Sequence, residues 1–163
     1  MRSFYMDASA LAKRYASEIG TPLIDRLFDT VSADRIYVLN LGVAEVVSIL
    51  VRKKNAGQLT VPAFNQALLE FGREIRSPVQ VRKITADNTL VTAALPLIEL
   101  HFINATDAVI LSSALDLAAE HRKVGNDLAL VASDQRLLRA AQAEGLTTFN
   151  PETQTQAGLD ALL

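Results

Sequence analysis

The stretch Arg2-Ser3-Phe4-Tyr5-Met6-Asp7-Ala8-Ser9-Ala10-Leu11 opens the chain with large side chains that stop at an acid. Its first half is typical of a buried strand, and a helical pattern begins at Ser9. A strand that is followed at once by a helix places Asp7 at the carboxyl edge of a sheet. Open α/β sheets bind their ligands at that edge. Asp7 is therefore the first candidate for a functional site.

Strands and helices alternate along the rest of the chain. Short apolar runs predict further strands at residues 36–39, 79–84, 128–132 and 146–149. Helical spacing predicts helices over 9–19, 21–31, 41–52, 61–75, 85–101, 107–121 and 136–143, with a kink or break at Pro96 and an N-cap at Thr106. Strands joined through helices run parallel, so we expect one α/β domain over residues 1–150 with a parallel sheet covered on both faces. Residues 151–163 are expected to form a C-terminal tail.

The composition limits the chemistry that the chain can support. It has 163 residues, a formal net charge of −2, no cysteine and two histidines, His101 and His121. Disulfides and thiolate metal sites are therefore excluded, and two histidines are too few for a histidine-rich zinc site. Any metal would have oxygen ligands, which favours Mg²⁺ or Mn²⁺.

No segment of the sequence is typical of export or of a membrane span. The charged N-terminus lacks the apolar run of a secretory peptide, and no stretch reaches the roughly 18 apolar residues of a membrane helix. We therefore expect a cytoplasmic protein without a membrane partner. The acidic net charge is not typical of nucleic-acid-binding proteins, so contacts to nucleic acid must depend on local clusters of cations.

Four acids from distant parts of the chain are expected to converge. Asp7 and Asp134 each follow a strand, Glu45 lies in an apolar helix after the second strand, and Asp107 begins a buried helix. Carboxylates at close range raise one another's pKa, and a divalent cation removes this repulsion. A hydrated Mg²⁺ on such a cluster can activate water for hydrolysis of a phosphodiester.

Each of these residues also has a structural interpretation. Asp107 can serve as a helix cap or first-turn acid, and Asp7 and Asp134 as ordinary acids at strand ends. Ser9 and Ser133 can cap the helices that follow them, or hold the neighbouring carboxylates or a metal-bound water. Glu45 is the hardest to explain structurally, because valines surround it in the sequence.

In four segments this pattern resembles the PIN-domain ribonucleases, and within them the VapC-like toxins of type II toxin–antitoxin modules. The segments are residues 5–15, 44–46, 106–111 and 131–138, so the likeness spans almost the whole chain. The resemblance implies a three-layer α/β/α domain that hydrolyses single-stranded or loop regions of RNA with Mg²⁺ or Mn²⁺. It implies that the metal-binding acids are Asp7, Glu45, Asp107 and Asp134, and that Ser9 and Ser133 line the site. It further implies a homodimer and an antitoxin whose C-terminal segment reaches the active site.

Binding of RNA requires cations near the acids. Lys13, Arg14 and Arg136 follow Asp7 and Asp134 closely, and we expect them to contact phosphates. The cations of 52–54 are more typical of a solvated helix end. The apolar residues of the helix over 61–75 favour core packing first and a groove for a partner helix second.

Other functions are compatible with parts of the pattern. A PIN nuclease that is not a toxin, or a metal-binding or protein-interaction module without turnover, would keep the same fold. A phosphotransfer or phosphatase domain is less favoured, because Ala8 and Ser9 follow Asp7 and no lysine lies near Asp134. A nucleotide-cofactor enzyme is disfavoured because no glycine-rich loop follows the first strand.

Overall fold

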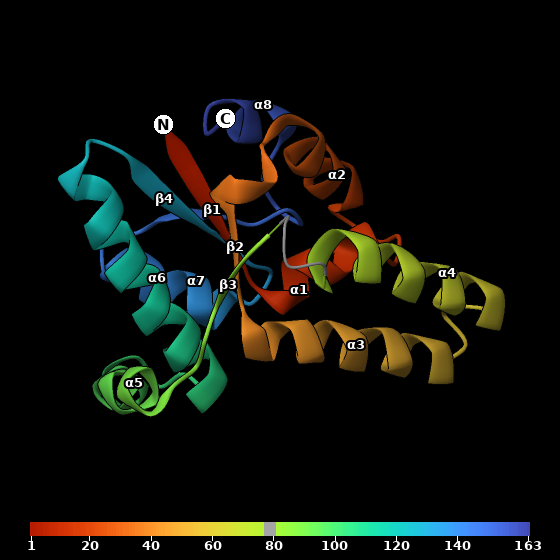
Figure 1. The fold of residues 1–163 in the computed structure, drawn as a ribbon, viewed down its shortest axis with the longest axis horizontal. Coiled ribbons are helices and arrows are strands. Elements are labelled where there is room, and N and C mark those ends of the chain that lie inside the picture. The colour runs from red at the N-terminus through yellow and green to blue at the C-terminus, as the bar shows by residue number, and fades with distance from the viewer. Residues whose placement is uncertain (77–80) are drawn as a thin grey trace.

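The structure is a computed structural model that describes residues 1–76 and 81–163. Within these residues five parallel strands form one sheet in the order β3-β2-β1-β4-β5 (Figure 1). The strands are β1 Arg2–Met6, β2 Ile36–Leu39, β3 Arg82–Ile84, β4 Asp127–Val131 and β5 Thr147–Phe149. The predicted parallel sheet is confirmed, with the opening strand at its centre. Of the strand predicted over 79–84, the first two residues lie outside the described part of the chain.

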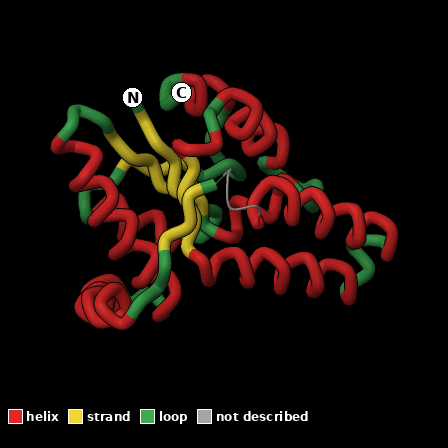
Figure 2. Tube along the Cα trace, in the orientation of Figure 1, coloured by secondary structure: helices red, strands yellow, loops and turns green. Residues whose placement is uncertain are grey.

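Helices cover both faces of the sheet (Figure 2). They are α1 Ala8–Leu11, α2 Thr21–Thr30, α3 Asn40–Asn55, α4 Val61–Phe71, α5 Asn88–His101, α6 Ala105–Lys123, α7 Gln135–Ala143 and α8 Gln156–Asp160. Side chains alternate across β1, so Phe4 and Met6 pack with α1 to α4, and Tyr5 packs with α5 to α7. The three-layer α/β/α architecture is therefore confirmed.

The first helix ends earlier than its sequence pattern predicts. After α1 the chain tightens into a 3₁₀ turn at Ala12–Arg14, and the helix predicted over 9–19 does not continue. The Thr21 hydroxyl donates a 2.7 Å hydrogen bond to the Lys13 carbonyl. A tertiary partner thus takes the carbonyl that a longer helix would use internally.

Several helices begin at a residue other than the predicted cap. Asn104, not Thr106, is the N-cap of α6, and its Oδ1 accepts the Asp107 N–H at 2.9 Å. The prediction failed because Asn104 is the last extended residue, whereas Thr106 already lies in the helix. The helix predicted over 85–101 begins at Asn88, and Pro96 lies inside it without dividing it. No single described helix is long and apolar enough to span a membrane, and α5 and α6 meet those criteria only as a pair bent by 111°.

The expected C-terminal tail, residues 151–163, packs on the domain. Leu159 of α8 is fully buried in the core beneath α2. Asp160 accepts a 2.6 Å hydrogen bond from Arg26 of α2. Gly20 adopts a positive φ of 93°, and a Cβ there would lie 2.7 Å from the Pro151 carbonyl oxygen. The segment therefore lies against the body of the domain in a position that only glycine at residue 20 permits.

Helices α3 and α4 extend beyond the sheet as an antiparallel pair (Figure 1). Phe71 is fully buried, and its ring packs edge-on against Tyr15 with 5.2 Å between the centroids. Phe64 and Leu68 are partly buried against the same core. The core interpretation of this helix holds for these three residues, whereas Leu69 is 57% exposed.

Candidate active site

The carboxyl edge of the sheet holds one pocket into which all four predicted acids converge. Asp7 follows β1, Glu45 lies on α3, Asp107 is in the first turn of α6, and Asp134 precedes α7. The pocket has a volume of about 400 Å³, and its lining residues are Asp7, Ala8, Ser9, Glu45, Ser48, Ile49, Arg52, Asp107 and Asp134. We call it the acid pocket.

Ser9 fixes the position of Asp7. Asp7 caps α1, and its Oδ2 accepts hydrogen bonds from the Ser9 N–H at 3.0 Å and from the Ser9 hydroxyl. The Ser9 Oγ in turn accepts the Ser133 N–H at 2.9 Å. One hydroxyl thus links the ends of the neighbouring strands β1 and β4, and Asp7 Oδ1 makes no side-chain hydrogen bond within the described chain.

Ser133 contributes its backbone N–H to this hydrogen-bond network, whereas its hydroxyl makes no contribution. Its Oγ is buried and has no hydrogen-bond partner among the described residues. It is absent from the lining of the acid pocket, unlike Ser9. The structure therefore brings Ser9 into the pocket and leaves Ser133 behind it.

Asp107 and Asp134 combine a structural role with their place in the pocket. Asp134 is the N-cap of α7, where its Oδ1 accepts the N–H groups of Arg136 at 2.7 Å and Leu137 at 3.2 Å. The Asp107 Oδ2 accepts a 2.7 Å hydrogen bond from the Asn104 side chain. These bonds aim both carboxylates without pairing either with a cation. The cap interpretation and the site interpretation are both compatible with the geometry.

The acids repel one another, which changes their titration. Burial, and then the charges of Asp7, Asp134 and Glu45, raise the pKa of Asp107 to about 7. Burial also raises the pKa of Asp7, against the hydrogen bonds from Ser9. Burial and the nearby Asp7 charge raise the pKa of Glu45. The pocket therefore carries more negative charge than its own cations balance.

The donors of the acid pocket match the ligand preference of Mg²⁺ and Mn²⁺. They are carboxylate oxygens with an excess of negative charge, and no sulfur or imidazole lines the pocket. Among the described residues, no three acids or histidines already lie close enough to share one metal ion. The chemistry of these donors thus fits a hydrated cation, which Asp7, Glu45, Asp107 and Asp134 would hold.

The structure does not bring Lys13 and Arg14 to the acid pocket, in contrast to the prediction. The Lys13 side chain is 3% exposed and pairs with Glu18 at 2.9 Å and Glu152 at 2.6 Å. Arg14 makes two hydrogen bonds to Glu74, at 2.7 and 2.8 Å, in a second pocket. The early end of the first helix turns both cations toward these acids, so neither is free to hold a phosphate of a substrate in the acid pocket.

Arg136 lies close to the acids, as its sequence position suggests. It is exposed on α7. Its positive charge lowers the pKa of Asp107, whereas burial and the neighbouring carboxylates raise it. Arg52, which the sequence pattern assigned to a solvated helix end, lines the acid pocket. Its distance of seven residues from Glu45 places both on the same face of α3, and this spacing is the signal that could have identified it.

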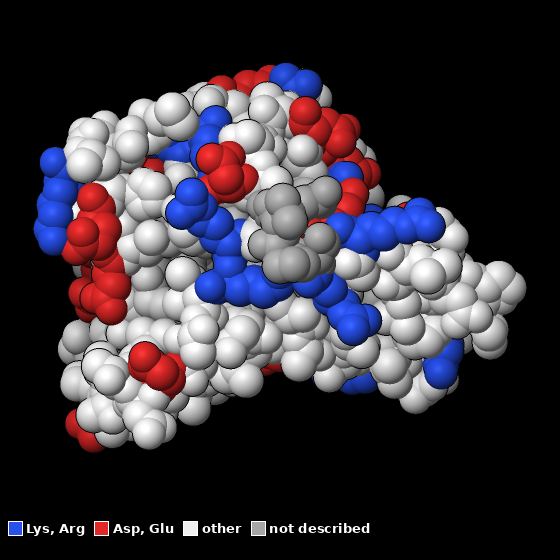
Figure 3. Space-filling view, viewed as in Figure 1, with Lys and Arg blue, Asp and Glu red and all other residues white. Residues whose placement is uncertain are grey.

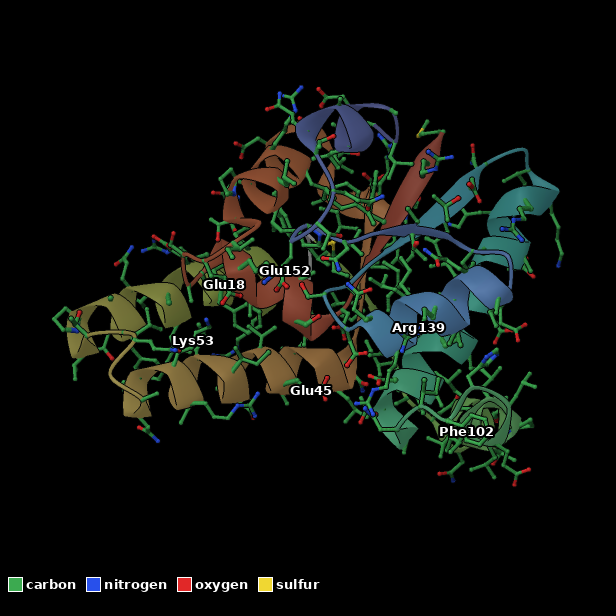
Figure 4. All side chains as sticks on the ribbon, turned by 180° about the vertical axis from the view of Figure 1, so that it is seen from behind. Glu18, Glu45, Lys53, Phe102, Arg139 and Glu152 are labelled. Atoms are coloured by element: carbon green, nitrogen blue, oxygen red, sulfur yellow. The ribbon has the colours of Figure 1, made fainter. Side chains whose placement is uncertain are left out.

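The net charge hides an uneven distribution over the surface. Figure 3 shows Lys and Arg side chains gathered in a band across the middle of one face, with Asp and Glu mainly nearer its margins. On the opposite side, seen in Figure 4, Glu45 lies on α3 and Arg139 on α7. Local clusters of cations therefore exist despite the overall charge of −2.

Comparison with known proteins identifies the fold. No protein-family model and no curated protein sequence matches the chain. The solved structure of PAE2754 from Pyrobaculum aerophilum matches with a TM-score of 0.63 and 17% identity, over 99% of this chain and 98% of that one. VapC20 of Mycobacterium tuberculosis, described as a sarcin–ricin loop cleaving toxin, gives 0.61 and 19%, over 94% and 100%. FitAcB from Neisseria gonorrhoeae gives 0.58 and 17%, over 93% and 99%.

These structures share their whole length with the chain at low sequence identity, which establishes a common fold. The chain therefore has the fold of VapC toxins, as the resemblance of its four segments implies.

Proposed function

We propose that this protein is a metal-dependent endoribonuclease and the toxin of a toxin–antitoxin pair. The observation that carries the proposal is the convergence of four carboxylates in one pocket at the carboxyl edge of a fold shared with an RNA-cleaving toxin. The acids come from four separate elements, and none of them forms an ion pair within the described chain. Helix capping alone does not explain why the four charges converge, because their mutual repulsion raises the free energy of the folded state.

In this proposal Asp7, Glu45, Asp107 and Asp134 hold Mg²⁺ or Mn²⁺. When bound, the cation supplies positive charge that activates water and stabilises the charge developing on the phosphate. The Ser9 hydroxyl fixes one oxygen of Asp7 and leaves the other for the ligand. Arg52 in the pocket and Arg136 beside it are placed to attract the phosphates of the substrate.

The proposal includes an antitoxin and a second copy of the chain as partners. The solved structures with this fold include a toxin–antitoxin complex from Klebsiella pneumoniae and VapBC2 from Rickettsia felis. On this chain, Val61 and Leu69 of α4 expose 62% and 57% of their surface. The proposal places the contact with a protein partner at these exposed side chains of α4.

Cleavage of a mixed RNA pool by the purified protein tests the activity. With Mg²⁺ or Mn²⁺ we expect cutting that a chelator prevents and that Asp7→Asn reduces at least a hundredfold, because the substitution removes a charge from the proposed metal site. Asp116→Asn on the exposed side of α6 is the matched control and should cut like the wild type. Equal cutting by wild type and Asp7→Asn would point to a contaminating nuclease.

A module that binds a partner without turnover is the second candidate. It is favoured by the separation of the acids, since no three of them in the described chain already lie within reach of one ion. Calorimetry with Mn²⁺ on antitoxin-free protein distinguishes the two. Absence of both metal binding and cutting would contradict the nuclease and leave the interaction module. A nuclease that is not a toxin would cut RNA but have no small antitoxin encoded beside it.

A further inference from the structure

Phe102 displays its ring to solvent to an unusual degree. It is 84% exposed, the highest value among the large apolar residues of the described chain. The other five phenylalanines are buried or half-buried. Single exposed apolar residues are common and need no explanation by themselves, so the surroundings of Phe102 decide its meaning.

The backbone of Phe102 is also unusual. Its φ of 54° makes it the one non-glycine residue with a positive φ among those described. It ends α5 in the left-handed conformation, and its N–H bonds to the Ile98 carbonyl at 2.9 Å. Glycine is the usual residue at such a position, because a Cβ costs energy there. The ring gains almost no burial in return, and conformations of this kind cluster at functional sites.

Phe102 forms one wall of a hollow that also contains two arginines. The hollow has a volume of about 400 Å³, and its lining residues are Leu100, His101, Phe102, Arg136, Arg139 and Ala140. Figure 4 shows Phe102 at the end of α5 and Arg139 on the neighbouring α7. The side chains of Arg136 and Arg139 are exposed and make no hydrogen bond or ion pair with any described residue. We call this site the Phe102 hollow.

Two residues of the Phe102 hollow are close in the sequence to residues of the acid pocket or to the residue that holds one of its acids. Phe102 lies two residues before Asn104, whose side chain holds Asp107. Arg136 lies two residues after Asp134 and acts electrostatically on Asp107. Arg136 therefore belongs to the hollow and lies near the acids.

We propose that the Phe102 hollow binds a nucleotide of single-stranded RNA next to the bond that is cut. The base stacks on the Phe102 ring, and Arg136 and Arg139 hold the adjacent phosphates. An aromatic ring beside free guanidinium groups provides the two contacts that single-stranded RNA requires, and stacking on a ring tolerates any base. No carboxylate lines the hollow, which favours an anionic ligand. This inference rests on the proposed nuclease function.

Fluorescence anisotropy with a labelled pool of random 12-nucleotide RNA tests the site on the full-length protein. The buffer contains EDTA, so binding is measured without cleavage. We expect Phe102→Ala to weaken binding about tenfold, and Phe102→Trp to retain it because tryptophan also stacks. Leu95→Ala removes an apolar side chain of α5 that is 54% exposed and should bind like the wild type.

A second probe isolates the contribution of the bases. On an abasic 12-mer, which keeps the sugars and phosphates, wild type and Phe102→Ala should bind equally. Arg139→Ala should weaken both probes and lower the salt dependence of binding, because it removes a phosphate contact. Thermal melting checks that each variant is folded.

The outcomes separate this inference from the proposed function. Failure of the wild type to bind the RNA pool would overturn the inference. Equal binding by Phe102→Ala and the wild type would also overturn it and would indicate that the Phe102 ring contacts a protein partner instead. Loss of binding by a folded Phe102→Trp as well as by Phe102→Ala would contradict stacking. The proposed nuclease function is tested separately, by the cleavage assay with Asp7→Asn, which does not depend on Phe102.

Discussion

Asp107 contributes a carboxylate to the acid pocket and lowers the stability of the folded protein. Burial and three neighbouring carboxylates raise its pKa to about 7 from the ordinary value of 3.8. The folded state therefore holds a proton between about pH 4 and pH 7 that the unfolded state has released. Because the folded state binds the extra proton, the free energy of unfolding decreases as the pH rises through this window.

We predict that Asp107→Asn stabilises the metal-free protein at high pH. The amide carries no charge, and its oxygen can still accept the hydrogen bond from Asn104. After allowance for solvent screening, we expect a gain of about 1–2 kcal/mol at pH 8, or roughly 2–4 °C in melting temperature per kcal/mol. The gain should shrink as the pH falls toward 4, where the unfolded state of the wild type also begins to bind the proton.

Thermal melting in metal-free buffer from pH 4 to pH 8 measures this effect. Asp116→Asn on the same helix is exposed and should change the melting temperature little at any pH. A loss of stability by Asp107→Asn at pH 8 would show that Asp107 is mainly a structural acid of the first turn.

Among the elements, the turn at Ala12–Arg14 connects distant parts of the chain. Lys13 pairs with Glu18 and Glu152, and Glu18 also pairs with Lys53 of α3 (Figure 4). Burial alone would lower the pKa of Lys13, but the hydrogen bonds that Lys13 donates to Glu152 and Glu18 outweigh burial and raise the pKa. The charge therefore stays on a buried lysine that holds the C-terminal segment against the turn.

We predict that Lys13→Met destabilises the protein by about 2 kcal/mol, because it leaves two carboxylates without their shared cation. Both carboxylates are partly exposed, which keeps the loss below that of a fully buried pair. Urea unfolding measures the change. Lys123→Met removes a surface pair with Glu120 and should cost less than about 0.5 kcal/mol.

The same variant distinguishes a structural lysine from a contact to RNA. If Lys13 only holds the C-terminal segment, the rate of RNA cleavage per folded molecule should match that of the wild type. A loss of cleavage without a loss of stability would restore the role in phosphate binding that its sequence position suggests.

The elements also show which features the sequence could reveal. A strand and the acid that follows it are adjacent in the sequence. The sequence alone could therefore place Asp7 and Asp134 at the carboxyl edge of the sheet. Lys13 and Arg14 could not, because their direction depends on the Thr21 hydroxyl, which ends the first helix, and on Glu74 and Glu152 far along the chain. The left-handed conformation of Phe102 has no signal in its sequence, since glycine is the residue expected there.

On the scale of the whole molecule, the acid pocket unites residues from four separate elements. Its carboxylates lie near one end of each of the elements β1, α3, α6 and α7. These elements come together only when the chain folds, so a ligand shared by the four acids would bind only the folded state. Binding to the folded state alone stabilises it by mass action.

We predict that Mn²⁺ raises the melting temperature at pH 7.5. At a free concentration one hundred times the dissociation constant the gain is about 2.7 kcal/mol, which corresponds to roughly 5–10 °C for a chain of this size. Asp7→Asn should abolish most of the shift, and Asp116→Asn should preserve it. An equal shift in all three proteins would indicate binding of metal elsewhere on the surface.

The central position of β1 determines when such a site can exist. β1 is synthesised before its neighbour β4, which ends at Val131, and the last acid of the pocket is Asp134. A nascent chain thus lacks both one flank of its sheet and one of its carboxylates until Asp134 has been synthesised. If the chain cuts RNA, it cannot do so while the ribosome is still making the segment between Asp7 and Asp134.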